Sequence, residues 1–164
     1  MLIRPAIAAD VPAILALERS SATAAHYSEE QYSQAIRQGL KSSAAGKPAS
    51  GGETEGQRRL ALVIEEDSQV KGFLLGRVLG DEWEIENVVV AEEARNRGLG
   101  AGLVGEFVKI AGAQGGQTVY LEVRETNAAA CRLYEGRDFV RTGKRKNYYR
   151  DPEEDAILYG LRLG

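Results

Sequence analysis

Residues 95–100, with the sequence Arg-Asn-Arg-Gly-Leu-Gly, constrain the fold of this chain more than any other segment. They follow an apolar run at 85–90 that predicts a buried strand, and they lead into a stretch at 99–114 whose apolar residues recur at helical spacing. In a strand, glycine-rich turn and helix, the glycines let the backbone approach a ligand, and the free amides of the first helical turn bind anions. The spacing differs from the dinucleotide and nucleoside triphosphate motifs, so the sequence predicts a phosphate site of another kind.

Length, charge and cysteine content limit what the chain binds. Its 164 residues are enough for one domain, 1–164, with a sizeable core. A formal net charge of −3 gives no general attraction to nucleic acid or to an anionic membrane, and we expect neither as a direct partner. The single cysteine, Cys131, excludes an internal disulfide, and no apolar stretch is long enough to span a membrane, so we expect a cytoplasmic protein.

The hydrophobic pattern predicts an α/β chain with a mixed, mostly antiparallel sheet. Asp10 is expected to cap a helix at 10–19, and Ser28 to begin a second helix that ends at Gly39. Residues 41–57, rich in Gly, Ser and Ala, indicate a flexible insertion loop. The other expected elements are strands at 2–4, 60–65, 70–78, 83–90, 118–123, 139–146 and 155–162, and helices at 99–114 and 127–137. The strand, helix and strand at 83–123 predict one parallel pair with a right-handed crossover.

The turn at 95–100 has the form R-x-x-G-x-G and, with its strand and helix, resembles the acetyl-coenzyme A site of the GNAT N-acetyltransferases. Four later motifs resemble the RimI-type branch, which acetylates the α-amino group of a ribosomal protein. They are L-E-V-R at 121–124, N-A-A-A at 127–130, L-Y-E at 133–135 and N-Y-Y at 147–149. The resemblance is close over 60–163 and loose over the first forty residues. It implies the GNAT fold, with a splayed strand pair and helices on both faces of the sheet.

The resemblance implies acetyl-CoA as co-substrate and no metal. The pyrophosphate would lie over the turn, and the pantetheine arm would bond main-chain groups of Val88 and Val90 where the strand splays from its neighbour. Asn127, at the start of the next helix, suits both an N-cap and a contact with the pantetheine. The implied cofactor-binding residues are Val88, Val89, Val90, Arg95, Asn96, Arg97, Gly98, Leu99, Gly100, Ala101, Asn127 and Tyr134.

Acetyl transfer to an amine requires a base and an acid. The amine must lose a proton, and an α-amino group, with an ordinary pKa of about 7.7–8.0, loses it readily near neutral pH. The resemblance implies Glu122 as the base, directly or through a water molecule, and Tyr134 as the acid for the leaving thiolate. The alternatives are a solvated carboxylate for Glu122 and a core tyrosine for Tyr134.

Five residues are expected to bind the acceptor. Glu84 and Glu86 share one face of their strand and could attract an amino terminus; otherwise they lie on a solvated face. His26 falls between the first two helices, where the family lines its substrate groove, although a solvent-exposed ring is the alternative. Tyr148 and Tyr149 belong to a hairpin that covers the peptide in the family. Because they follow the basic run 144–146, contact with RNA is the competing interpretation.

The chain departs from the family pattern at two places. Asp138, rather than glycine, precedes Phe139 at the end of the helix that carries Tyr134; aspartate tolerates the left-handed conformation required there. The insertion at 41–57 lies beside the implied peptide groove. The leading hypothesis is acetylation of the N-terminal α-amine of a protein, with a ribosomal protein as the implied acceptor and a monomer or weak dimer as the expected state. The alternatives are a GNAT that acetylates a small amine or a lysine side chain, and a non-catalytic acyl-CoA sensor.

Overall fold

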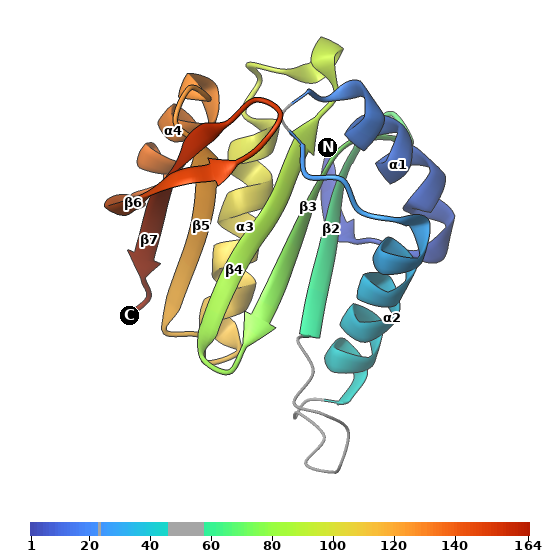
Figure 1. The fold of residues 1–164 in the computed structure, drawn as a ribbon. Coiled ribbons are helices and arrows are strands. Elements are labelled where there is room, and N and C mark those ends of the chain that lie inside the picture. The colour runs from blue at the N-terminus through green and yellow to red at the C-terminus, as the bar shows by residue number, and fades with distance from the viewer. Residues whose placement is uncertain (23, 46–57) are drawn as a thin grey trace.

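The computed structural model describes residues 1–22, 24–45 and 58–164 (Figure 1). Its centre is a seven-stranded sheet with the order β1-β2-β3-β4-β5-β7-β6. The strands are β1 (Leu2–Pro5), β2 (Arg58–Glu66), β3 (Gln69–Leu79), β4 (Glu82–Val90), β5 (Thr118–Arg124), β6 (Val140–Tyr149) and β7 (Glu154–Arg162). Among these strands, β4 and β5 are parallel and every other neighbouring pair is antiparallel. The predicted mixed, mostly antiparallel sheet is therefore confirmed.

Helices cover both faces of the sheet, as predicted (Figure 1). The helices α1 (Val11–Ser20) and α2 (Glu29–Ala45) pack on one face, where Ile14, Tyr32 and Phe73 belong to one buried cluster. The helices α3 (Leu99–Ala113) and α4 (Ala128–Glu135) pack on the other, where Phe107 and Leu121 belong to a second cluster. Short 3-10 turns precede α1 (Ala8–Asp10) and α3 (Glu92–Ala94). No helix in the described ranges is long and apolar enough to cross a membrane.

Two details of the N-terminal third differ from the sequence predictions. Asp10 occupies the predicted N-cap position of α1, but its side chain makes no capping bond to the helix; it is buried, accepts the Ile7 N–H at 2.8 Å and pairs with Arg4 at 2.8 Å. Helix α2 does not end at Gly39 but continues to Ala45, because residues 41–45 include good helix formers and one internal glycine costs only about 1 kcal/mol. The loop expected over 41–57 is therefore wrong for its first five residues, 41–45, which are helical, and 46–57 lie outside the described residues.

Two other local predictions are confirmed. Ser28 and Gln31 form the capping box of α2: the Gln31 N–H donates to the Ser28 hydroxyl, and the Ser28 N–H donates to the Gln31 side chain. Asp138 has φ of 68°, so it adopts the left-handed conformation that ends the α4 region in place of glycine. Both features depend only on residues that are near neighbours in the sequence.

A β-bulge in β4 creates the opening on which the site is built. Strands β4 and β5 pair from Glu82 to Ile85 and then separate. At that point Leu75 pairs with Asn87 and Gly76 with Ile85, so Glu86 is an extra residue. The bulge reverses the alternation of β4. Before it, Ile85 packs toward α3; after it, Asn87 and Val89 face α1 and α2. The predicted splayed strand pair is confirmed.

Candidate active site

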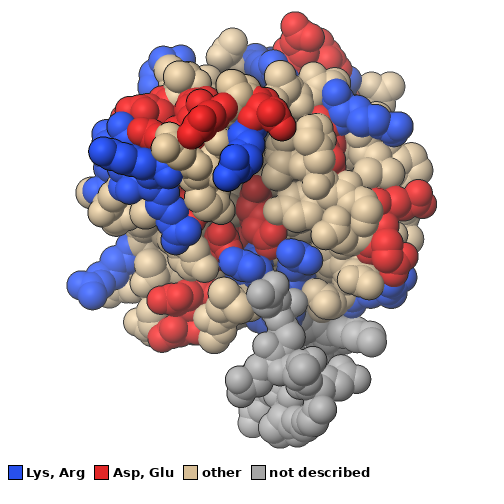
Figure 2. All heavy atoms as spheres, viewed as in Figure 1, with Lys and Arg blue, Asp and Glu red and all other residues tan. Residues whose placement is uncertain are grey.

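A cleft of about 760 Å³ opens where β4 leaves β5. Its walls are the segment between α1 and α2, the two splayed strands, the start of α4 and the loop between β6 and β7. In Figure 2, acidic side chains lie at the floor of a hollow near the middle of this face, with basic side chains directly below them. Nine of the residues predicted from the sequence line the cleft: Val88, Asn127, Tyr134, Glu122, His26, Glu84, Glu86, Tyr148 and Tyr149.

The other predicted cofactor residues lie outside this cleft. Val89 is buried in the core between the sheet and α1 and α2. The turn at 95–98 and the first residues of α3 follow β4 directly. Gly98 is the N-cap of α3 with φ of 80°, and no side chain of ranges 1–22, 24–45 and 58–164 forms a cap bond there. The first N–H groups of α3 are therefore left for another acceptor, which is the arrangement that binds a phosphate.

The two arginines of the turn already have protein partners. Arg97 pairs with Glu66 at the end of β2, and this contact lowers the pKa of the Glu66 carboxyl. The Arg95 Nε donates to the Val90 carbonyl at 3.1 Å. That carbonyl is one of the main-chain groups that the family resemblance assigns to the pantetheine arm. A carbonyl oxygen has two lone pairs, so it can accept a ligand N–H without losing Arg95.

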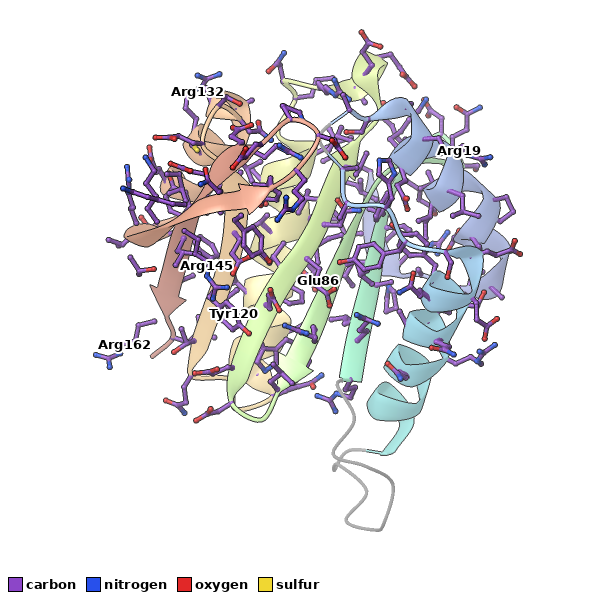
Figure 3. All side chains as sticks on the ribbon, in the orientation of Figure 1. Arg19, Glu86, Tyr120, Arg132, Arg145 and Arg162 are labelled. Atoms are coloured by element: carbon purple, nitrogen blue, oxygen red, sulfur yellow. The ribbon has the colours of Figure 1, made fainter. Side chains whose placement is uncertain are left out.

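Glu122 lies on β5 beneath the β6–β7 hairpin rather than on a solvated face. Its side chain is only 16% exposed, and Arg145 Nε lies 3.5 Å from its carboxylate. The same carboxylate raises the pKa of Tyr148. Figure 3 shows Arg145 beside β5 with Glu86 across the open face on β4. The Glu122 carboxylate therefore opens into the cleft, while the β6–β7 hairpin covers it from bulk solvent.

Tyr134 and Asn127 come from α4 and its N-terminus. Tyr134 is buried against Phe139 and Tyr159, with ring centroids 5.7 and 6.2 Å away, and it makes no hydrogen bond to any described residue. Burial, followed by the nearby Tyr149, raises its pKa, so the hydroxyl keeps its proton at neutral pH. The Asn127 Oδ1 accepts the Ala130 N–H at 3.1 Å, which confirms it as the N-cap of α4.

The two acidic residues of β4 that line the cleft, Glu84 and Glu86, are neutralised by basic partners that the sequence did not reveal. Glu86 accepts hydrogen bonds from Arg59 Nε at 3.1 Å and from the Tyr27 hydroxyl at 2.8 Å. Glu84 pairs with Arg77, although burial raises the pKa of the Glu84 carboxyl. Arg59, Arg77 and Glu84 lie opposite one another on three adjacent strands. This alignment depends on strand register, and the alternation of β2 and β3 alone does not fix it.

Buried polar side chains fix the segment between α1 and α2. His26 is exposed, and its Nδ1 lies 3.2 Å from a carboxylate oxygen of the buried Glu18. The same oxygen accepts the Tyr27 N–H at 3.0 Å. From the opposite wall, Asn87 donates to the Ala25 carbonyl at 3.0 Å. Sequence analysis missed Glu18 and Asn87; the available signal was a polar residue at a position that helical or strand periodicity assigns to the core.

Comparisons with known proteins agree with this geometry. Residues 15–139 match the model of the Acetyltransferase (GNAT) family. Over 111 residues, 66% of this chain and 75% of the relative, the chain is 36% identical to the ribosomal protein bS18 alanine N-acetyltransferase of Salmonella typhimurium. The enzyme of the same name from Haemophilus influenzae is 36% identical over 112 residues, 66% of this chain and 76% of the relative.

Solved structures give the same result. The crystal structure of the ribosomal-protein-S18-alanine N-acetyltransferase from Escherichia coli matches with a TM-score of 0.77 and 28% identity, over 99% of this chain and 94% of that one. Ard1 from Thermoplasma volcanium shares the fold, with a TM-score of 0.80 and 24% identity over 99% and 97% of the two chains. GNAT acetyltransferases use acetyl-CoA as co-substrate. The chain therefore belongs to the GNAT family and is an acetyl-CoA-dependent N-acetyltransferase.

Proposed function

We propose that this enzyme transfers an acetyl group from acetyl-CoA to the α-amino group at the N-terminus of a protein. A ribosomal protein is the favoured acceptor, because two relatives that are 36% identical are named for acetylating an alanine of bS18. In this proposal the turn at 95–98, the head of α3 and Val88 form the donor end of the site. The segment between α1 and α2, the acidic residues of β4 and the β6–β7 hairpin form the acceptor end.

Acetyl-CoA supplies the acetyl group activated as a thioester. Glu122 accepts a proton from the α-ammonium group, directly or through one water molecule, so that the neutral amine can attack. Removing this proton costs little free energy near neutral pH, because the ordinary pKa of an α-amino group is about 7.7–8.0. Tyr134 holds a proton at its hydroxyl and donates it as charge develops on the departing sulfur. Asn127 orients the pantetheine arm.

The observation that carries the proposal is the meeting of Glu122 and Tyr134 in one cleft. They come from different elements, β5 and α4, and both line the opening where β4 separates from its neighbour. Glu122 is shielded by the hairpin, and the raised pKa of Tyr134 keeps its hydroxyl protonated, with no hydrogen bond to any residue that the structure describes. An acyl-CoA sensor has no need for a base and an acid arranged in this way.

Acetyl transfer to synthetic peptides tests the proposal. One peptide carries a free N-terminal alanine and no lysine; its partner has the same sequence with a blocked N-terminus and one internal lysine. We expect acetylation of the first at a far higher kcat/KM. Preference for the blocked peptide would overturn the assignment in favour of a lysine acetyltransferase. A panel that varies the first two residues then defines the acceptor.

A further inference from the structure

Arg124, at the end of β5, contacts the β6–β7 hairpin through two hydrogen bonds and an aromatic ring. Its Nη1 donates to the Pro152 carbonyl at 3.1 Å, and its Nη2 donates to the Arg150 carbonyl at 3.2 Å. Its guanidinium lies 4.5 Å from the centroid of the Tyr149 ring. All three partners belong to the turn of the hairpin or to the residue just before it. Arg124 is also two residues from Glu122, and both line the cleft.

Glu154 extends this contact to the start of α4. One of its carboxylate oxygens lies 3.4 Å from Arg124 Nη1. The other accepts the Thr126 N–H at 2.7 Å and the Thr126 hydroxyl at 2.6 Å. These bonds lower the pKa of the Glu154 carboxyl, with Thr126 as the largest cause. Thr126 immediately precedes Asn127, so one carboxylate links the hairpin to the connection that carries the pantetheine-contacting residue.

Polar contacts, rather than buried apolar ones, hold the closed end of the hairpin; one is the bond from the Asn147 N–H to the Asp155 carboxylate at 2.8 Å. Strand β6 is an edge strand, and nearly all of its side chains are exposed. It therefore contributes little buried apolar surface, which is the usual source of stability for a hairpin. Its pairing with β7 is interrupted between Arg145 and Tyr149, just before the turn. Its other described links to the β5–α4 connection include the ion pair between Lys144 and Glu125.

We propose that Arg124 and Glu154 act as a clamp that fixes the β6–β7 hairpin over the acceptor end of the cleft. Arg124 is thus a positioning residue: it does not touch the reacting atoms but sets the place of Tyr148 and Tyr149, which line the cleft. The identity of the acceptor rests on the proposed function, whereas the clamp itself does not. The clamp requires an arginine, because one planar guanidinium can bond two carbonyls and lie over an aromatic ring at the same time. A lysine has only a single ammonium group to offer.

The kinetic test compares Arg124→Lys with Arg141→Lys. Both changes keep the charge, and Arg141 is an exposed residue of β6 without a described partner. For Arg124→Lys we expect the KM for the acceptor peptide to rise about tenfold. A rise of this size corresponds to the loss of one or two charged hydrogen bonds. The KM for acetyl-CoA should stay within about twofold. Arg141→Lys should leave both constants unchanged.

Hydrogen exchange provides a readout that does not depend on the acceptor. In Arg124→Lys, amides of residues 147–154 should exchange faster, while those of β2 and β3 keep their rates. Thr126→Val, which removes only the hydroxyl bond to Glu154, should give a smaller change in the same direction. It serves as the test if the arginine variant does not fold. Unchanged exchange at 147–154 in a folded variant would overturn the clamp, whichever peptide the enzyme acetylates. If exchange is faster in the variant but the wild-type enzyme acetylates no peptide at its N-terminus, only the proposed function is overturned.

Discussion

The proposed donor and acceptor ends of the site are built in different ways. At the donor end, one continuous segment supplies the strand, the turn and the helix, and the groups proposed to bind the ligand are backbone amides beside Gly98. At the acceptor end, side chains from separate segments meet: Tyr27 and Arg59 on Glu86, and Arg124 on the hairpin. The proposed donor end thus depends on backbone geometry, and the proposed acceptor end on paired side chains.

The difference has a consequence for how each end responds to mutation. A site made of backbone groups is sensitive to chain geometry and tolerant of most side-chain changes. A site made of paired side chains is sensitive to single polar substitutions, because each one leaves a partner without its bond. Variants that move only one of the two Michaelis constants therefore test whether the two ends are independent.

The largest effect is expected from Glu122→Gln. The change keeps the size of the side chain and removes the base, so kcat with a free N-terminal peptide should fall by about a hundredfold or more. Acetyl-CoA binding, measured by calorimetry, should be unaffected. A kcat within about threefold of the wild type would show that another group takes the proton.

Tyr134→Phe should have the next largest effect. The ring still packs on Phe139 and Tyr159, so the protein should remain folded, while the proton donor is lost. We expect kcat to fall about tenfold, less than for the base, because a thiolate with an ordinary pKa of about 8.5 leaves without full protonation. Unchanged turnover at saturating substrates would remove Tyr134 from the mechanism.

Gly98→Ala tests the donor end, with Gly115→Ala as a matched control at the other end of α3. The two glycines have φ of 80° and 84°, and an added Cβ would meet nothing within 4 Å at either position. Both variants should lose about 1–2 kcal/mol of stability from left-handed strain. We expect only Gly98→Ala to raise the KM for acetyl-CoA, by about fivefold, since only Gly98 belongs to the turn proposed to bind the phosphates. Equal KM values in the two variants would contradict the assigned site.

Tyr27→Phe should give the smallest effect, confined to the acceptor end. It removes the hydroxyl that donates to Glu86 but keeps the ring under Arg59, whose guanidinium lies 5.8 Å from the ring centroid. Because Arg59 still neutralises the carboxylate, we expect only a two- to threefold rise in the peptide KM, about 0.5 kcal/mol. A change in the acetyl-CoA KM of the same size would mean that the two ends are coupled.

The sequence predicted the strand, turn and helix of the proposed donor end well because their signals are local. One stretch of chain contains the apolar run of β4, the glycine spacing of the turn and the periodicity of α3. Elsewhere in the chain, the capping residues Ser28 and Asn127 each bond an amide three residues further on. The same is true of Asp138, whose conformation follows from its place at the end of a helix. For each of these features, hydrogen bonding between near neighbours decides the structure.

The acceptor end was predicted only as a set of residues. That Glu84 and Glu86 lie on one face follows from alternation, but their partners Arg59 and Arg77 depend on the register of three strands. Asp10 was predicted correctly as the N-cap residue of α1, but the partner of its carboxylate was not, because that partner, Arg4, lies on the first strand. The end of α2 was misplaced because a glycine permits a helix to stop without requiring it.

The extra residue at Glu86 also limits how this site can change. One strand serves both layers of the protein, with Ile85 packing on one side and Val89 on the other, only because a single residue separates the two phases of β4. Replacing the glutamate would alter one charge. Deleting it would turn Asn87 and the valines after it toward the wrong layers and remove the departure of β4 from β5. At this position, chain length is therefore more tightly constrained than residue identity.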